Sequence, residues 1–295
     1  MRPLMFRWKA QIRGLLFVLW SILACVSPSL ADTSKFHRFK GGVPEFHGND
    51  KIASSLIVKH RKGYSIGFSP LLHQSLWVAY RLTPKDVTQG GGRIGAFRRD
   101  EDLSQTLPPA LYSGTGYDRG HLAPSIDMRY NEVVSRQSFW MGNISPQKAR
   151  LNRGQWKSLE RKIHNLASSA STEVARAREV YVITGPLFTK KQLKAACRSP
   201  TLDEKKAKAD GNTFAGLASI VPYAFYKVYL YNGVVHAEIY QQIEKDSTQN
   251  VERHFSVSLK TLEKHTGITF FPQMSPGLRQ FYFNQCHSTQ FDKEE

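Results

Sequence analysis

The spacing of apolar side chains changes along the chain, and each spacing predicts a different kind of element. In residues 155–166 they recur every three or four positions, at Trp156, Leu159, Ile163 and Leu166. This is the repeat of an α-helix with one buried face, so the segment is predicted to be helical. Residues 257–266 are predicted to form another helix, which ends at Gly267 because glycine commonly follows a helix terminus.

Short apolar runs bounded by turn residues predict β-strands. These runs are residues 57–59, 64–68, 76–82, 179–184, 224–230 and 234–241. The first two are expected to pair, and the run at 179–184 is expected to stop at Gly185 and Pro186. The last two flank Asn232-Gly233, a dipeptide favoured in two-residue hairpin turns.

Segments without either period are predicted to be irregular. They are a leader over residues 32–55, loops at residues 90–92 and 103–117, a charged surface segment over residues 190–210 and a tail over residues 276–295. Strands and helices do not alternate regularly, which favours an antiparallel sheet. We therefore expect one α+β domain, residues 56–275, with a mostly antiparallel central sheet flanked by helices.

The first 31 residues have the composition of a secretory signal peptide. Four basic residues precede an apolar run over residues 15–26, and the small residues Ser29 and Ala31 suit a cleavage site. We expect a cleaved signal, a secreted or periplasmic protein, and no stable membrane association after cleavage. An uncleaved N-terminal anchor and a lipoprotein attached at Cys25 are the alternatives.

The chain is strongly basic, which narrows the partners that its surface would attract. Lys and Arg total 41 against 24 Asp and Glu, and the formal net charge is +17. Loss of the four positive charges in residues 1–31 would reduce +17 to +13. Such a field attracts nucleic acid, anionic membranes or acidic polysaccharides, although a basic surface can also serve solubility alone.

Cysteine usage is compatible with export. Cys197 and Cys286 remain after the expected signal, and an even pair permits a disulfide in an oxidising compartment. Two unpaired thiols are the alternative. Neither cysteine belongs to a CxxC motif, so a zinc site built from thiolates is not expected.

The segment Asp118-Arg119-Gly120-His121 places an imidazole beside a guanidinium and a carboxylate. A histidine is suited to act as a general base because its usual pKa lies near neutral pH. A neighbouring arginine can bind phosphate through two parallel hydrogen bonds. A histidine that is merely hydrogen-bonded within a turn is the alternative interpretation.

A second group of polar residues follows farther along the chain. Asn152, Trp156 and Glu160 lie at intervals of four, so on one continuous helix they would share a broad face. Asn152 and Glu160 would then lie about 12 Å apart along the axis, at ~1.5 Å per residue. This separation suits one direct oxygen ligand and one carboxylate acting through water, which Mg²⁺ tolerates. A helix cap at Asn152 and a solvated Glu160 are the alternative.

Taken in order, these motifs resemble those of the DNA/RNA non-specific endonuclease family. Asp118-Arg119-Gly120-His121 is followed by Asn143-x-x-Pro-Gln and by Asn152-x-x-x-Trp-x-x-x-Glu. Weaker similarity extends from about Tyr64 to about Phe271. The family belongs to the ββα-metal, or His-Me finger, nucleases, so the resemblance implies a ββα active-site motif.

The resemblance implies a role for each residue that matches a motif. His121 would be the base that activates water, and Asn152 the sole direct protein ligand of a hydrated Mg²⁺. Glu160 would hold metal-bound water, and Asp118 would anchor the turn. Mn²⁺ suits the same oxygen ligands.

Further residues are implied to bind phosphate or to support the site. Asn143 matches an asparagine that positions groups near the active centre, and Arg119 would support the same region. Arg93 matches the arginine that binds phosphate and stabilises the transition state. Because that match crosses a variable loop, Arg98 or Arg99 is the alternative.

We therefore expect an endonuclease that hydrolyses DNA and RNA without strong sequence preference, because the implied contacts go to phosphates rather than to base edges. The resemblance implies 5′-phosphate ends. The alternatives are a non-catalytic basic module that binds nucleic acid, a site-specific HNH-type nuclease, and a phosphodiesterase with a denser cluster of metal-binding side chains. The sequence is compatible with a homodimer, and it does not indicate which inhibitor protein would bind.

Two basic stretches allow two interpretations each. The helix predicted at residues 155–166 carries three basic residues on one side, Lys157, Arg161 and Lys162. Six lysines lie within residues 190–208. Either stretch could bind the phosphate backbone of a nucleic acid. Either could equally be a solvated surface, which is the usual role of a run of charges.

Overall fold

The computed structural model describes residues 41–168, 179–198, 220–242 and 254–285, and all of them belong to one unit of the chain, residues 34–295. The expected signal peptide and Cys286 lie outside the described residues. Export and the disulfide between Cys197 and Cys286 therefore stay predictions. None of the helices within the described ranges has the length and apolar character of a membrane span.

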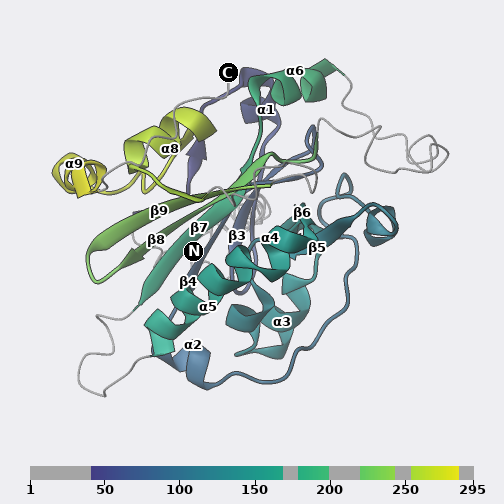
Figure 1. The fold of residues 1–295 in the computed structure, drawn as a ribbon, viewed down its shortest axis with the longest axis horizontal. Helices are drawn as coiled ribbons and strands as arrows, with labels where there is room; N and C mark the ends of the chain where they lie inside the picture. The colour runs from purple at the N-terminus through teal and green to yellow at the C-terminus, as the bar shows by residue number, and fades with distance from the viewer. Residues whose placement is uncertain (1–40, 169–178, 199–219, 243–253, 286–295) are drawn as a thin grey trace, which may run out of the picture. The chain divides into compact units, whose positions relative to one another are not determined.

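An antiparallel sheet forms the centre of the fold (Figure 1). Seven strands of the described residues build it in the order β10-β9-β8-β7-β4-β3-β2. They are β2 (Ile57–His60), β3 (Ser65–Ser69), β4 (Gln74–Leu82), β7 (Val180–Leu187), β8 (Ala224–Tyr231), β9 (Val234–Gln241) and β10 (His254–Ser256). The predicted strands are confirmed. The predicted hairpin turn has positive φ at Asn232 (49°) and Gly233 (74°), as a type I′ turn requires.

Strand β7 continues past the stop that we expected at Gly185 and Pro186. These two residues pair with Tyr226 and Phe225 of β8. The pairing of β4 with β7 ends at Thr184, so Pro186 lies where β7 has a neighbouring strand on one side only. Proline, which lacks a backbone donor, is tolerated at such a position, and the predicted end of the strand was wrong.

Helices cover both faces of the sheet (Figure 1). On one face lie α2 (Pro84–Thr88), α3 (Glu132–Ser138), α4 (Ala149–Arg153) and α5 (Gln155–Ser168), and on the other α1 (Asp50–Ser55), α6 (Lys190–Arg198), α8 (Leu259–Thr266) and α9 (Pro276–Gln285). The predicted helix α5 is confirmed. Helix α8 begins after its cap Ser258 and ends at Gly267, whose φ is 66°. The α+β class is likewise confirmed.

Three segments that we expected to be irregular contain helices. Helix α1 lies in the expected leader, α6 in the charged segment and α9 in the tail. Each buries one side chain in the core of the sheet: Ile52, Ala196 and Tyr282. In α1 the Asn49 side chain also accepts a hydrogen bond from the Ile52 amide (3.2 Å), which caps the helix. With lengths of only 6, 9 and 10 residues, these helices offer too few turns for an apolar period to stand out.

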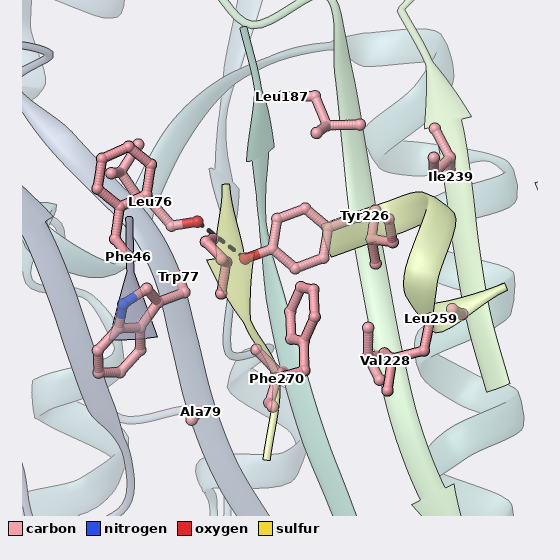
Figure 2. Close-up of a cluster of buried hydrophobic side chains, with 14 of the residues drawn as sticks. Phe46, Leu76, Trp77, Ala79, Leu187, Tyr226, Val228, Ile239, Leu259 and Phe270 are labelled. Atoms are coloured by element: carbon pink, nitrogen blue, oxygen red, sulfur yellow. Dashed lines mark hydrogen bonds between the residues drawn. The ribbon is translucent and has the colours of Figure 1, made fainter. Parts of the chain in front are cut away.

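Apolar side chains pack against both faces of the sheet. On the face toward α8, the Tyr226 ring packs edge-on against Phe270 (5.6 Å), and its hydroxyl donates a hydrogen bond to the Leu76 carbonyl (2.9 Å; Figure 2). On the opposite face, Trp156 of α5 is fully buried and packs against Phe225 of β8 (5.7 Å). Large aromatic side chains contribute much of the burial energy of a core, so Trp156 holds α5 firmly on the sheet.

A hairpin and a helix beside the central sheet form the predicted ββα unit. Strand β5 (Tyr117–His121) pairs with β6 (Ile144–Lys148), and α4 and α5 follow directly. The two strands are separated by an excursion over residues 122–143, which contains η3 (Ser125–Met128), α3 and η4 (Met141–Asn143). The expected continuous helix is wrong, because the chain breaks at Gly154 (φ −101°, ψ −113°). Asn152 therefore lies on α4 and Glu160 on α5.

The remaining short elements are β1 (Glu45–Phe46), β11 (Ile268–Thr269) and η2 (Pro109–Tyr112). Strand β1 pairs with β11 in an antiparallel manner, which ties the start of the described chain to the segment after α8. The 3-10 helix η2 lies within the loop predicted over residues 103–117, which is otherwise irregular.

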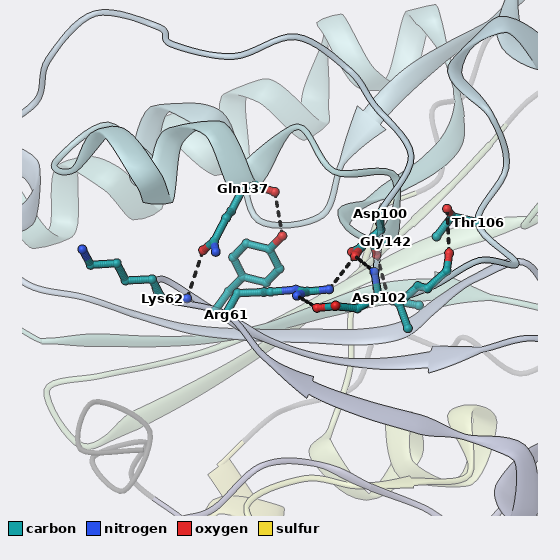
Figure 3. A network of polar contacts seen from close by, with 10 residues as sticks. Arg61, Lys62, Asp100, Asp102, Thr106, Gln137 and Gly142 are labelled. Atoms are coloured by element: carbon teal, nitrogen blue, oxygen red, sulfur yellow. Dashed lines mark hydrogen bonds and ion pairs between the residues drawn. The ribbon is translucent and has the colours of Figure 1, made fainter. Parts of the chain in front are cut away.

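A buried ion pair anchors the loop that leads from α2 to β5. Arg61, in the turn between β2 and β3, contacts Asp100 (2.6 Å) and Asp102 with its guanidinium, which also lies 4.5 Å from the Trp140 ring (Figure 3). The Asp100 side chain is fully buried, whereas that of Asp102 is half exposed. Burial raises the pKa of Asp100, and the charge of Arg61 opposes that shift.

Arg61→Met should destabilise the protein by about 3–5 kcal/mol, because it leaves the buried Asp100 carboxylate without its cation. Asp102→Ala is the matched control and should cost roughly 0–1 kcal/mol, since half of that side chain faces solvent. Urea denaturation followed by circular dichroism would measure both free energies of unfolding. Equal losses in the two variants would contradict a special role for the buried pair.

Candidate active site

A cleft of about 590 Å³ opens at the ββα unit, between β5, η3, α4, α5 and the loop that carries Arg93. Five of the residues predicted for the site line it: Arg93, Arg119, His121, Asn152 and Glu160. Cationic side chains dominate its wall, namely Arg93, Arg119, Arg129, Arg153, Lys157 and Arg161, whereas the acidic lining residues are Asp118 and Glu160. Such a wall attracts a polyanion.

His121 ends strand β5, opposite Ile144 of β6, and its ring is enclosed by aromatic side chains. The ring centre lies 4.9 Å from that of Phe139 and 5.4 Å from that of Phe97. Burial, reinforced by the positive charge of Arg93, lowers the pKa of His121 to about 3. The imidazole is therefore neutral at physiological pH. Its Nε2 atom is buried and forms no hydrogen bond with the described residues.

Asn143 does not line the cleft but fixes the chain directly after His121. Its side chain is fully buried; Oδ1 accepts a hydrogen bond from the Ala123 amide (2.9 Å), and Nδ2 donates to the carbonyls of Ala123 (2.9 Å) and Ser138 (2.8 Å). The Leu122 amide donates to the Asn143 carbonyl (2.9 Å). These bonds close the excursion over residues 122–143, so Asn143 acts as a positioning residue.

Asp118 orients the side chain that was predicted to bind metal. Its carboxylate accepts hydrogen bonds from Asn152 Nδ2 (2.9 Å) and from the guanidinium of Arg153 (2.7 and 2.9 Å). Burial would raise the pKa of Asp118, but the hydrogen bonds from Arg153 and Asn152 outweigh it and lower that pKa. Because Nδ2 of Asn152 is engaged, Oδ1 is the end of the amide that can act as a ligand. Asp118 was expected to anchor the turn, and its contact with Asn152 was not predicted from the sequence.

Glu160 is held by Lys227, a residue that was not predicted to belong to the site. Lys227 projects from β8 and is completely buried, and its Nζ atom lies 3.7 Å from Glu160 Oε1. The same Nζ lies 4.3 Å from the centre of the Trp156 ring. Burial raises the pKa of Glu160 and lowers that of Lys227, and each charge opposes the shift of the other. A lysine within an apolar strand is a signal that could have identified this pair.

The structure separates the three arginines that the sequence could not rank. Arg93 lines the cleft, and its guanidinium lies 4.7 Å from the centre of the Phe139 ring. The neighbouring Ile94 is fixed from both sides, since its amide and carbonyl bond to the Ser135 hydroxyl (3.2 and 2.9 Å). Arg98 and Arg99 are not among the lining residues. Of the three arginines, Arg93 is therefore the one that lines the cleft.

A second buried polar group joins η3, which lines part of the cleft, to its neighbours. Asp127 of η3 is buried and accepts hydrogen bonds from His164 Nδ1 (2.8 Å) and from the Tyr80 hydroxyl (3.0 Å). It therefore ties η3 to both α5 and β4. His164 follows Glu160 by one helical turn, so the interval of four residues could have pointed to it. Arg119 lies 4.8 Å from the centre of the Phe97 ring and helps to hold that wall in place.

The donor atoms in the cleft fit a hydrated hard cation. Asn152 offers an amide oxygen, and Glu160 offers a carboxylate in the same cleft. Among the residues that the structure describes, no three His, Cys, Asp or Glu side chains gather as a metal site. A cation that keeps most of its water needs few protein ligands, and oxygen donors suit it.

Comparisons with known proteins agree with this fold. A family model described as DNA/RNA non-specific endonuclease matches residues 49–276. Mitochondrial endonuclease G of Homo sapiens is 27% identical over 231 residues, covering 74% of this chain and 70% of that protein. Nuclease C1 of Cunninghamella echinulata var. echinulata is 30% identical over 225 residues, covering 72% and 82%. A crystal structure of the EndoG/EndoGI complex aligns with a TM-score of 0.56 at 24% identity, over 82% of this chain and 92% of that one.

The fold and the match over residues 49–276 define an enzyme that hydrolyses phosphodiester bonds. The chain belongs to the DNA/RNA non-specific endonuclease family, a family of metal-dependent nucleases. The predicted family and enzyme class are therefore confirmed.

Asp118→Ala should lower cleavage activity about 10–100-fold, the usual effect of removing the partner that orients a metal ligand. The loss should shrink as the concentration of divalent metal rises, because a freely rotating Asn152 amide binds metal more weakly. Plasmid cleavage rates over a metal titration would measure this.

Glu132→Ala is a suitable control, since it breaks the exposed ion pair of Glu132 with Arg136 (2.6 Å) away from the cleft. Its rates should match those of the unmodified protein. An Asp118→Ala defect that is the same at every metal concentration would show that Asp118 does not act through Asn152.

Proposed function

We propose that the protein is an exported, Mg²⁺-dependent endonuclease that cuts DNA and RNA with little sequence preference and leaves 5′-phosphate ends. One observation carries the proposal: a single cationic cleft contains the neutral His121, the amide oxygen donor of Asn152 and the cationic Arg93. Mn²⁺ suits the same oxygen donors. Export rests on the composition of residues 1–31.

His121 supplies the base in this mechanism. With its lowered pKa the imidazole is neutral, so its unprotonated ring nitrogen can take a proton from the water that attacks phosphorus. Phe97 and Phe139 hold the ring in place and keep it in an apolar environment. The hydrogen bonds of Asn143 to Ala123 fix the backbone directly after the base, so its position is set before the substrate arrives.

Positive charge stabilises the transition state. Arg93 provides a fixed guanidinium at the wall of the cleft, where it can bind a phosphate oxygen without reorganising during the reaction. Asn152 and Glu160 would hold Mg²⁺, Asn152 directly and Glu160 through water. When bound, the metal neutralises charge that develops on the phosphorane and on the leaving 3′ oxygen.

A non-catalytic module that binds nucleic acid is the second candidate, and the cationic wall alone would support it. Such a module has no need for a neutral histidine in the same cleft as an oxygen donor for metal. A weak preference for sequence follows from the same wall, because phosphate contacts carry little sequence information.

Purified protein should degrade both supercoiled plasmid and structured RNA with Mg²⁺, and EDTA should stop both reactions. His121→Ala should reduce the rates by at least about 100-fold, since proton transfer by a positioned base contributes at least that much. Gel electrophoresis of the products would measure the loss, and sensitivity of the new ends to a 5′-phosphate-dependent exonuclease would test their chemistry. Intact substrates bound in a salt-sensitive way would support the non-catalytic module instead.

The His121 ring should stay neutral as the pH falls from 8 to about 5, because its pKa of about 3 lies far below the usual 6.5. Nitrogen-15 NMR of labelled protein would follow the ring, and the His121→Ala spectrum would assign its signals. Arg93→Gln should raise the titration midpoint slightly, since burial is the larger cause of the shift. A midpoint near 6.5 in the unmodified protein would show that the ring is not shielded.

A further inference from the structure

A second hollow lies along the exposed side of α5, next to the cleft. It has a volume of about 470 Å³ and is lined by Ser158, Arg161, Lys162, Asn165 and Leu166, which we call the α5 groove. Arg161 lines both the cleft and the α5 groove. The two hollows are therefore adjacent, and a strand leaving the cleft past Arg161 would enter the α5 groove.

The cations of this surface are not neutralised by the protein. Lys157, Arg161 and Lys162 are exposed, and none of them forms an ion pair with a carboxylate among the described residues. Four arginines outside the α5 groove do have such partners: Arg81 with Glu179, Arg136 with Glu132, Arg153 with Asp118 and Arg279 with Glu263. The one acidic residue of α5, Glu160, turns inward to Lys227.

The spacing of the polar side chains follows the helix axis. Lys157, Arg161 and Asn165 lie on successive turns, about 6 Å apart at ~1.5 Å per residue. This interval is similar to the separation of neighbouring phosphates on a nucleic-acid strand. Lys162 lies beside this row, and its Nζ atom is 5.8 Å from the centre of the Tyr229 ring. His236 stacks on the same ring (4.6 Å between ring centres, 14° between planes). This stacking holds the Tyr229 ring in place beneath Lys162.

We propose that the α5 groove is a second binding site for the phosphate backbone, which holds the substrate strand beyond the cleft. The proposal rests on the proposed function, because the strand in the α5 groove is the one whose phosphodiester is cut. In this site the aligned cations and amide donors of the α5 groove bind the phosphates of an extended nucleic-acid strand. They make no contact with the base edges. Long substrates gain affinity from it, and a dinucleotide that occupies the cleft alone does not.

Lys162→Glu tests this site without touching the cleft, because Lys162 lines the α5 groove alone. The KM for long duplex DNA should rise about tenfold while kcat stays unchanged, and the slope of log KM against log salt should fall by about 1. Cleavage of a dinucleotide should not change. Lys162→Arg should restore the KM for long DNA, because it restores the charge.

Lys264→Glu is the matched control. Lys264 is an exposed lysine of α8, on the opposite face of the sheet, and its substitution changes the net charge equally. Its KM should equal that of the unmodified protein. If both variants raise KM equally, the effect is one of overall charge, and the proposal is wrong.

The remaining outcomes separate this proposal from the proposed function. Failure of the unmodified protein to cut either substrate would overturn the proposed function. Normal cutting with an unchanged KM in Lys162→Glu would overturn the α5 groove alone, as would an equal loss on the dinucleotide. If Lys162→Glu weakened binding only to phosphatidylserine vesicles, the groove would be a membrane contact and the proposal would again be wrong.

Discussion

The buried ion pair of Lys227 on β8 with Glu160 on α5 fixes the position of α5 on the sheet, and the site depends on that position. Lys227 has no exposed surface, its ammonium lies beside the Glu160 carboxylate and the Trp156 ring, and the Asp127 carboxylate also acts on its charge. Such a pair adds little net stability, but separating it costs about 3–5 kcal/mol. Helix α5 therefore cannot slide or rotate on the sheet without leaving Lys227 unpaired in an apolar environment. This constraint sets the register of α5, and with it the place of Glu160 in the cleft.

The sequence predicts the reacting groups better than the groups that hold them. His121 and Asn152 belong to short local motifs, and both line the cleft as expected. Lys227 reaches Glu160 from a strand 67 positions later in the chain, and no local spacing encodes that contact. The bond from Asn152 to Asp118 likewise exists only after the chain breaks at Gly154 and α4 turns toward β5. Contacts that depend on tertiary packing were the ones that the motifs could not predict.

For the fold, the periodic elements were predictable and the short ones were not. Helix α5 and the hairpin of β8 and β9 carry strong local signals, an apolar face and an Asn232-Gly233 turn. Helix α1 forms because Asn49 caps it and Ile52 finds a place in the core, which depends on strands far away in sequence. The end of β7 was misjudged for a related reason. Proline stops a strand only where a neighbour requires its missing amide, and Pro186 lies beyond the reach of β4.

The closed excursion over residues 122–143 has a consequence for chain entropy. Its ends are joined by the β5–β6 ladder and by the hydrogen bonds of Asn143, so the distance between His121 and Asn152 does not depend on how much chain lies between. Doubling the length of such a loop adds only about 0.6 kcal/mol of closure entropy. The excursion can thus lengthen or shorten at little cost while the reacting groups keep their geometry. Changes in its length must keep Ser135 in place, because the Ser135 hydroxyl holds the backbone of Ile94. Without this hydroxyl, Ile94 and the neighbouring Arg93 would lose their anchor.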